Sequence, residues 1–152
     1  MIAGLLLKRG DADAVICGAV GRYLTQLKHV GQVIGRMPGA RGFATLSATF
    51  MPTGPLFIAD TYVSYDPSAE QIAEMTLIAA DEVRRFGVTP KIALLSHSNF
   101  GSEDTQSARK MREVLSILRD WSPELEVEGE MHADAALSSF IREEIFTRSR
   151  LS

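Results

Sequence analysis

The sequence predicts an α/β fold in which a mixed sheet lies between helices. Short apolar runs typical of strands alternate along the chain with segments whose apolar residues recur at helical spacing. The 152 residues are enough for one domain with a full hydrophobic core. Hydrophobic residues make up 45% of the chain and charged residues 23%, a composition typical of soluble globular proteins.

Charge and hydropathy argue against several classes of protein. A net charge of −3 argues against binding to nucleic acid or to a membrane surface, because both usually need a basic excess. No uncharged apolar run reaches the ~18 residues of a membrane span, and the N-terminal segment lacks the basic leader of a signal peptide. The single cysteine, Cys17, cannot form an internal disulfide. We therefore expect a cytoplasmic protein without nucleic-acid or membrane partners.

The first part of the chain predicts a strand, a helix and a hairpin. Residues 14–20 form a short apolar run that predicts a buried strand. Residues 23–35 predict a helix that ends at Gly35. The apolar face of this helix consists of Leu24, Leu27, Val30, Gly31 and Ile34. Residues 43–52 and 55–63 are β-rich and flank the turn sequence PTGP, so they predict an antiparallel hairpin.

The middle of the chain contains the clearest helix signal. Asp66 predicts its N-cap, Pro67 its first helical position and Gly87 its end. The expected buried face consists of Ile72, Met75, Ala79, Val83 and Phe86. Residues 91–96 then predict another buried strand.

The last third predicts a helix, a strand and a second helix. The first helix extends to Trp121 and ends near Pro123, with Ala108, Met111, Leu115 and Leu118 facing inward. Residues 125–131 alternate between apolar and polar side chains, as strands do. Asp134 is a candidate N-cap for the final helix. The apolar face expected for that helix consists of Leu137, Phe140, Ile141 and Ile145.

The loop after the strand predicted at residues 91–96, SHSNFGSED, is the main candidate site. Hydroxyl, amide and backbone N–H groups there could bind phosphate or carboxylate. These groups belong to Ser96, Ser98, Asn99, Gly101 and Ser102. Against this reading, Glu103 and Asp104 lie where an anion would bind and can satisfy the dipole of the next helix themselves. A simple connector is therefore the alternative.

Cysteine and histidine have structural explanations that compete with functional ones. Cys17 lies within an apolar run, which favours a buried structural cysteine over a catalytic thiol. His29, His97 and His132 lack the short spacing of metal ligands, so we expect no metal site. His97 is the most interesting of them because it follows a strand end, where α/β folds bind ligands. A surface or packing histidine is the alternative.

Charged residues give two further clusters. The basic residues that follow the first predicted strand are Arg22, Lys28, Arg36 and Arg41. Such residues usually form a solvated face, although their position after a strand also suits a binding role. Glu128, Glu130 and Asp134 could act in acid–base chemistry only if burial raised a pKa. Solvated or capping roles are favoured for these three carboxylates.

Five segments, taken in order, resemble the phosphate acetyltransferase/butyryltransferase family and cover nearly the whole chain. They are GDADAVICGAV, LFIADTYVSYDPSAEQIAEM, KIALLSHSNFGS, SARKMREVLSIL and LEVEGEMHADAAL. The resemblance is closest to the phosphotransacetylase-like C-terminal domain of bacterial NADP-dependent malic enzymes. It implies a three-layer α/β/α fold with a mostly parallel sheet, like that of isocitrate and isopropylmalate dehydrogenases. Residues 1–40 would end a first subdomain, residues 41–152 would form most of a second, and the domain would form a homodimer or a larger homo-oligomer.

The resemblance also bears on activity. Active family members transfer an acetyl group between coenzyme A and phosphate without a metal at the reacting centre. An arginine that the family places in its cleft aligns with Lys28, which is a weaker clamp because lysine lacks the planar fork. Arg22 could replace some of the lost charge. The family's later cleft segments have no counterpart in these 152 residues, so we expect part of a larger domain that does not itself catalyse acetyl transfer.

We therefore expect a regulatory and oligomerising segment of a malic enzyme that senses acetyl-CoA or acetyl phosphate and contains no catalytic residue. Its expected ligand-binding residues are Lys28, Arg22, Ser96, Ser98, Asn99, Gly101 and Ser102. The segment would need no cofactor, while NADP and a divalent metal would bind another domain of the parent, which converts malate to pyruvate. The alternatives are part of a true phosphate acetyltransferase and a purely structural dimerisation module.

Overall fold

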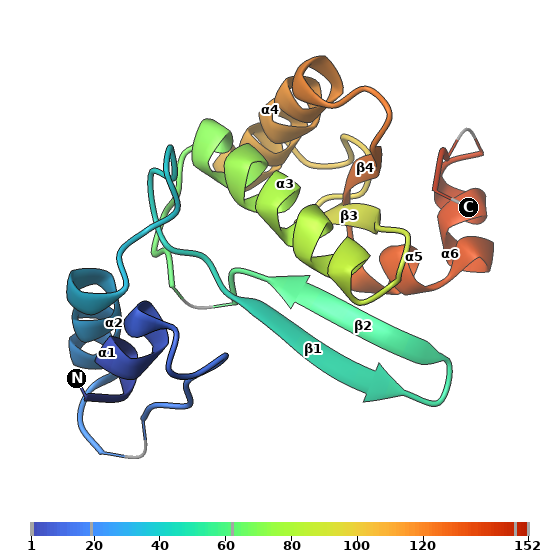
Figure 1. The fold of residues 1–152 in the computed structure, drawn as a ribbon. Coiled ribbons are helices and arrows are strands. Elements are labelled where there is room, and N and C mark those ends of the chain that lie inside the picture. Colours follow the sequence, from blue (N-terminus) through green and yellow to red (C-terminus); the bar gives the residue numbers. More distant parts are fainter. Residues whose placement is uncertain (1, 19, 62, 148, 152) are drawn as a thin grey trace. The chain divides into compact units, whose positions relative to one another are not determined.

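The computed structural model describes residues 2–18, 20–61, 63–147 and 149–151. The chain forms two compact units, Met1–Phe43 and Ala44–Ser152. The assignment of residues 1–40 and 41–152 to two subdomains of the family fold stays a prediction. The α/β class is confirmed, because helices and paired strands both occur along the chain (Figure 1).

The first unit contains two short helices, α1 (Ile2–Arg9) and α2 (Tyr23–Val33). They contact each other, and a Cβ added at Gly4 would lie 3.3 Å from Val33. The helix α2 is followed by Gly35 at a φ of +90°, so the predicted end is confirmed. None of the described residues of this unit is buried.

The strand predicted for residues 14–20 is wrong over the described residues. Residues 14–18 and 20 have no strand structure, and Ile16 is fully exposed. Cys17 is exposed too, so its predicted burial is also wrong. Ala19 lies outside the described residues. The physical reason is that a strand needs a neighbour for its backbone hydrogen bonds, and the strand pairs of the described chain all lie in the second unit.

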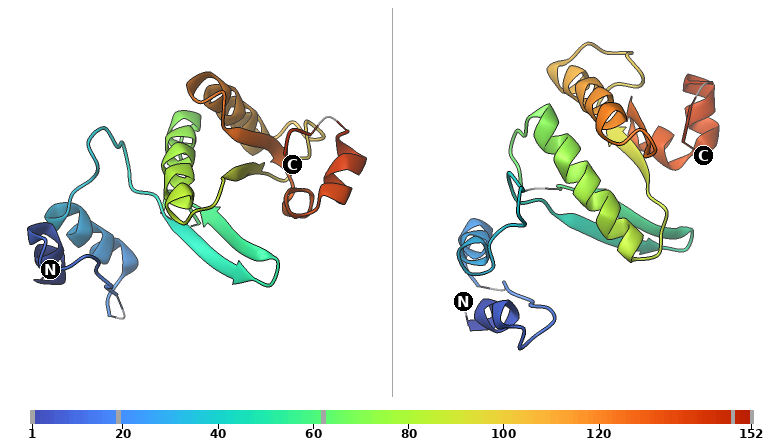
Figure 2. Two further views of the ribbon diagram at one scale, coloured as in Figure 1. Left: turned by 45° about the vertical axis from the view of Figure 1, so that its right-hand side comes forward. Right: turned by 45° about the horizontal axis from the view of Figure 1, so that its top comes forward.

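The second unit begins with the predicted hairpin. Strands β1 (Leu46–Met51) and β2 (Gly54–Ala59) pair in antiparallel register, with Met51 opposite Gly54. Gly54 has a φ of +128°, which favours glycine at the turn. The turn projects away from the helices of this unit (Figures 1 and 2). The second strand ends at Ala59, earlier than predicted, because Asp60 adopts a left-handed φ of +48°.

Helix α3 (Ala69–Arg85) is confirmed, but its predicted N-cap is wrong. Ser68 caps the helix in place of Asp66. Its hydroxyl accepts from the Gln71 backbone N–H, and the Gln71 side chain accepts from the Ser68 N–H. The carboxylate of Asp66 instead binds Lys110 of helix α4 (Gln106–Trp121). These two reciprocal bonds form a capping box. They satisfy two backbone N–H groups at the start of the helix that have no partner within it, which explains why α3 starts later than predicted.

The buried face of α3 differs from the predicted face. Its fully buried residues are Ala69, Ala73, Thr76, Ala80 and Val83, so Val83 is common to both, and the predicted Ile72 is half-buried and packs against the core. Phe86 is exposed and tilts against Phe57 of β2. Four of the five buried residues are alanine or threonine, and such small side chains let α3 lie close beside α4 (Figure 2). The predicted stop is confirmed by Gly87, which has a φ of +75°.

A β–α–β segment forms the rest of the core. Strands β3 (Lys91–Leu95) and β4 (Glu126–Met131) pair in parallel, and α4 joins them. The core consists of Ala69, Ala73, Ala80, Leu94, Val114, Leu115, Leu118, Leu125 and Val127. In the described chain, the strands form two separate two-stranded sheets, one antiparallel and one parallel, instead of the single mixed sheet that was predicted.

The predicted final helix is instead two short helices, α5 (Ala133–Leu137) and α6 (Ser139–Ile145). Ser138 between them has an extended backbone, and its hydroxyl accepts from the Ile141 N–H to cap α6. The predicted apolar face is wrong, because Leu137, Phe140 and Ile145 are exposed. Over the residues that were searched, no helix combines the length and the apolar character needed to cross a bilayer.

Candidate functional site

The candidate site is the loop of residues 96–105 between β3 and α4. It begins where the Ser96 N–H donates to the Met131 carbonyl at the end of β4. It ends at Thr105, whose hydroxyl accepts from the Ala108 N–H and caps α4. Between these points Ser98 is completely buried. The loop is therefore anchored at both ends and packed inward at its middle.

Glu130 reaches this loop because β4 contains one residue more than β3 at this point. Leu94 pairs with Gly129 but Leu95 pairs with Met131, so Glu130 has no partner on β3. Such bulges redirect a side chain. Gly129 beside it has a φ of +143°, and an added Cβ would lie only 2.6 Å from the Leu94 backbone oxygen. Glycine is therefore required next to the glutamate.

The Glu130 carboxylate is only 1% exposed and accepts three hydrogen bonds at one oxygen. The donors to Oε1 are the Ser98 hydroxyl at 2.7 Å, the Gly101 N–H at 2.8 Å and Arg112 Nη1 at 2.8 Å. Burial acts to raise the pKa of Glu130, and it is the largest single influence. The hydrogen bonds together outweigh it, so the pKa of Glu130 lies below its usual value.

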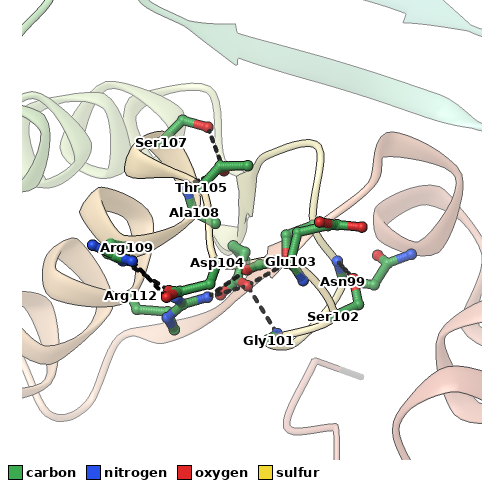
Figure 3. Close-up of polar contacts among 12 residues, drawn as sticks. Asn99, Gly101, Ser102, Glu103, Asp104, Thr105, Ser107, Ala108, Arg109 and Arg112 are labelled. Carbon is green, nitrogen blue, oxygen red and sulfur yellow. Dashed lines mark hydrogen bonds and ion pairs between the residues drawn. The ribbon is translucent and has the colours of Figure 1, made fainter.

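Arg112 extends this contact to the protein surface. Its other terminal nitrogen, Nη2, lies 2.9 Å from the Asp104 carboxylate, which also pairs with Arg109 (Figure 3). A hydrogen bond from Arg109 is the main reason why the pKa of Asp104 is lowered. Asp104 and Arg109 are exposed, so salt screens their pairing. Salt screens the contact between Arg112 and the buried Glu130 much less, because one partner is removed from solvent.

Two further contacts shape the tip of the loop. Phe100 has a left-handed φ of +48°, and its ring stacks on Phe146 at a centroid distance of 4.4 Å. The Phe100 N–H donates to the Glu130 backbone oxygen. Asn99 Oδ1 accepts from the His132 N–H, just before α5. The tip is thus held by α5, by the end of α6 and by β4.

Glu128 is also buried, with 3% exposure, but it contacts another segment. Its Oε2 accepts from the Ser149 hydroxyl at 2.6 Å and from the Arg150 N–H at 2.7 Å. Arg142 is buried as well and donates to Ser149 Oγ and to the Leu151 carbonyl. This second buried carboxylate therefore holds the segment of residues 149–151.

The solvated or capping roles predicted for Glu128 and Glu130 are wrong. Alternation in residues 125–131 suggested one exposed face, whereas Val127 to Met131 are all buried. The signal that could have located Glu130 is the loop itself, because its many hydrogen-bond donors indicate that an anion binds there. Asp134 lies in the first turn of α5 and accepts from the Ala135 N–H, while the N-cap position is His132.

The structure brings together the five loop residues of the predicted site, since Ser96, Ser98, Asn99, Gly101 and Ser102 all belong to this loop. Lys28 and Arg22 belong to the first unit, where both are exposed. Lys28 lines an open depression of about 410 Å³ together with Leu24, Leu27, Gly31, Gln32, Arg36 and Phe43. Arg22 precedes α2 without a side-chain capping bond. The ligand-binding roles of all seven residues stay predictions.

The histidines do not form a cluster in the described structure. His97 and His132 are exposed, and His29 is half-buried in the first unit. Among the described residues, no three His, Cys, Asp or Glu side chains are grouped so that they could hold a metal ion.

Several known proteins are similar to this chain. It is 51% identical over 152 residues to an NAD-dependent malic enzyme of Rhizobium meliloti (strain 1021), and 48% identical over 151 residues to an NADP-dependent malic enzyme of Escherichia coli (strain K12). These alignments cover 100% and 99% of the chain but only 20% of each relative. A phosphate acetyltransferase of Paracoccus denitrificans is 36% identical over 92% of the chain and 46% of its own length.

The fold has relatives among solved structures. The crystal structure of a phosphotransacetylase from Streptococcus pyogenes superposes with a TM-score of 0.84 at 27% identity, covering 99% of this chain and 46% of that one. Residues 1–152 match the family described as Phosphate acetyl/butaryl transferase. The chain therefore belongs to the phosphate acetyl/butyryl transferase family.

Proposed function

We propose that this chain is the phosphotransacetylase-like segment of a malic enzyme and serves it as a regulatory and oligomerising module. The observation that carries the proposal is the 51% identity to a malic enzyme over all 152 residues, compared with 36% to a phosphate acetyltransferase. The chain spans about a fifth of the length of these malic enzymes. Under this proposal, the oxidative decarboxylation of malate to pyruvate, with its nicotinamide cofactor and divalent metal, belongs to another part of the parent.

The proposed ligand is acetyl-CoA, or acetyl phosphate, bound as an effector. Two features support binding without catalysis. The Lys28 ammonium is a point charge, whereas an arginine at this position would bind an anion through two parallel hydrogen bonds. In the loop, the Ser98 hydroxyl and the Gly101 N–H already bind Glu130 and cannot also stabilise a reacting group. We further propose that the parent is a homodimer or a larger homo-oligomer.

The test uses the full-length parent. Malate-dependent reduction of NAD⁺ and of NADP⁺ is measured with and without acetyl-CoA, and binding is measured by calorimetry. We expect acetyl-CoA to bind and to change the rate, and Lys28→Ala to weaken binding. Lys8→Ala, which removes an exposed lysine of α1, is the matched control. No binding and no change in rate would refute the sensor and leave a structural module.

Part of a genuine phosphate acetyltransferase is the second candidate, favoured by the 36% identity to such an enzyme. It is tested by incubating the same parent with acetyl-CoA and inorganic phosphate and measuring acetyl phosphate. We expect none above background. Sustained formation of acetyl phosphate that disappears in Lys28→Ala would replace the regulatory proposal with the enzymatic one.

A further inference from the structure

Most backbone donors of the loop at residues 96–102, together with the Ser98 hydroxyl, are used within the protein. The Ser96 N–H binds Met131, the Asn99 N–H binds Ser102 Oγ, and the Ser102 N–H binds the Asn99 carbonyl. The Gly101 N–H and the Ser98 hydroxyl both donate to Glu130 Oε1. The loop is therefore closed around a carboxylate that comes from the chain itself.

The set of donors around Glu130 is the kind that proteins use for anions. A backbone N–H, a hydroxyl and a guanidinium converge on one oxygen within 2.8 Å. Consecutive loop N–H groups and an arginine are common partners of phosphate and carboxylate ligands. Here the position of such a ligand is filled by a side chain with 1% exposure.

We propose that Glu130 is the positioning residue of this loop. It acts as an internal anion that occupies the hydrogen-bonding site formed by Ser98, Gly101 and Arg112. It thereby excludes an external phosphate from that site. Arg112 is held between two carboxylates, Glu130 and Asp104. Among the described loop residues, the hydroxyl proton of Ser102 and the side-chain N–H groups of Asn99 are neutral donors that no hydrogen bond uses, and the buried Ser96 hydroxyl has no partner either.

This assignment limits what the loop can recognise. Figure 3 shows Asn99 and Ser102 near each other and away from Arg109. An amide and a hydroxyl suit a neutral carbonyl oxygen, whereas a phosphate is best bound by cations and free N–H groups. The role of Glu130 does not depend on the proposed binding of acetyl-CoA, but the part of the ligand that the loop contacts does. The loop contacts the acyl or amide part of that ligand and not its phosphates.

The test compares two buried glutamates of one strand in the full-length protein. Glu130→Gln keeps the shape but removes the charge, and Glu128→Gln does the same at a residue that contacts residues 149–151. Hydrogen exchange is followed in peptides that cover residues 96–105. We expect exchange to accelerate about tenfold in Glu130→Gln, in keeping with the loss of one charge-assisted interaction, and to stay unchanged in Glu128→Gln.

A second part of the test adds phosphate or acetate to the exchange experiment. Inorganic phosphate should not slow exchange of the loop in the wild type. In Glu130→Ala, acetate should restore protection, because it can replace the missing carboxylate between Ser98, Gly101 and Arg112. Where Glu130→Ala fails to fold, the result for Glu130→Gln decides.

Two results would overturn the proposal. The first is that the loop of the Glu130→Gln variant exchanges its amide hydrogens at the wild-type rate. The second is that inorganic phosphate slows exchange in the loop of the wild type. Calorimetry with acetyl-CoA keeps the two proposals apart. Failure of the wild type to bind acetyl-CoA refutes the regulatory function but leaves the exchange experiment able to decide the role of Glu130.

Discussion

Glu128 and Glu130 lie two residues apart on β4, and both are buried, yet they hold different parts of the molecule. Glu130 contacts a cation directly and ties the loop after β3 to α4. Among the described residues, Glu128 accepts from a hydroxyl and from backbone N–H groups, and Arg142 donates to the same Ser149 oxygen. Several donors that converge on a buried carboxylate can therefore offset the cost of its burial.

The largest expected effect comes from a change between the two carboxylates. In Gly129→Ala the new Cβ would meet the Leu94 backbone at 2.6 Å, at a φ of +143° that alanine rarely adopts. We expect about 3 kcal/mol or more of destabilisation and loss of order around both glutamates. Urea unfolding can be followed by the fluorescence of Trp121, the single tryptophan of the 152 residues.

Gly87→Ala is the control for this change, because Gly87 has a φ of +75° but open space around it. It should cost only about 1 kcal/mol, the strain of one left-handed residue. Equal losses in the two variants would show that the close approach of Gly129 to β3 has no role.

A change at Arg142 should affect the Glu128 region alone. Arg142→Met removes donors to Ser149, Ala135 and Leu151 and leaves buried acceptors unpaired. We expect a loss of about 2 kcal/mol, with faster hydrogen exchange in residues 133–151. Exchange in residues 96–105 should not change. Arg119→Met, at an exposed arginine of α4, is the matched control, and equal exchange in both variants would contradict the proposed contact.

A smaller effect, dependent on pH, is expected for Glu130→Gln. Because the folded-state pKa of Glu130 is lowered, its ionised form stabilises the fold at neutral pH, by about 1–2 kcal/mol. This contribution is complete above the pKa of an unfolded glutamate, ~4.3, and is lost as the pH falls through the lower folded-state pKa. The difference in unfolding free energy between wild type and variant should therefore narrow below about pH 4.3. A constant difference down to pH 3 would contradict the lowered pKa.

The smallest effect is expected at the surface. Arg109→Ala removes the exposed partner of Asp104 but leaves Arg112 in contact with both carboxylates. We expect no measurable change in the midpoint of urea unfolding at moderate salt, since exposed ion pairs contribute little. A clear loss, removed by added salt, would show that the surface pair helps to hold Arg112 against Glu130.

Much of the fold could be predicted because its signals are local. The PTGP turn located the hairpin, and Gly87 located the end of α3, since turns and caps depend on a few neighbouring residues. The face of α3 was misjudged because large apolar residues were favoured over the alanines that pack against α4. The strand prediction is wrong for residues 14–18 and 20, because an apolar run cannot show whether a partner strand is available.

The candidate site was predicted in part. The donors of residues 96–102 were correctly grouped in one loop, since they are contiguous. The anion that they bind was missed because Glu130 is about 30 residues away and comes from a bulge that no sequence pattern indicated.

The sequence by itself therefore determined the α/β class, the hairpin, the β–α–β segment and the family, because periodicity, turn residues and motif order act along the chain. Only the tertiary structure decided which carboxylates are buried and what they bind. Burial depends on what covers both faces of β4, and hydrogen bonding depends on donors from α4, from the loop after β3 and from residues 149–151. Those contacts join distant parts of the chain, and their geometry exists only once the core has formed.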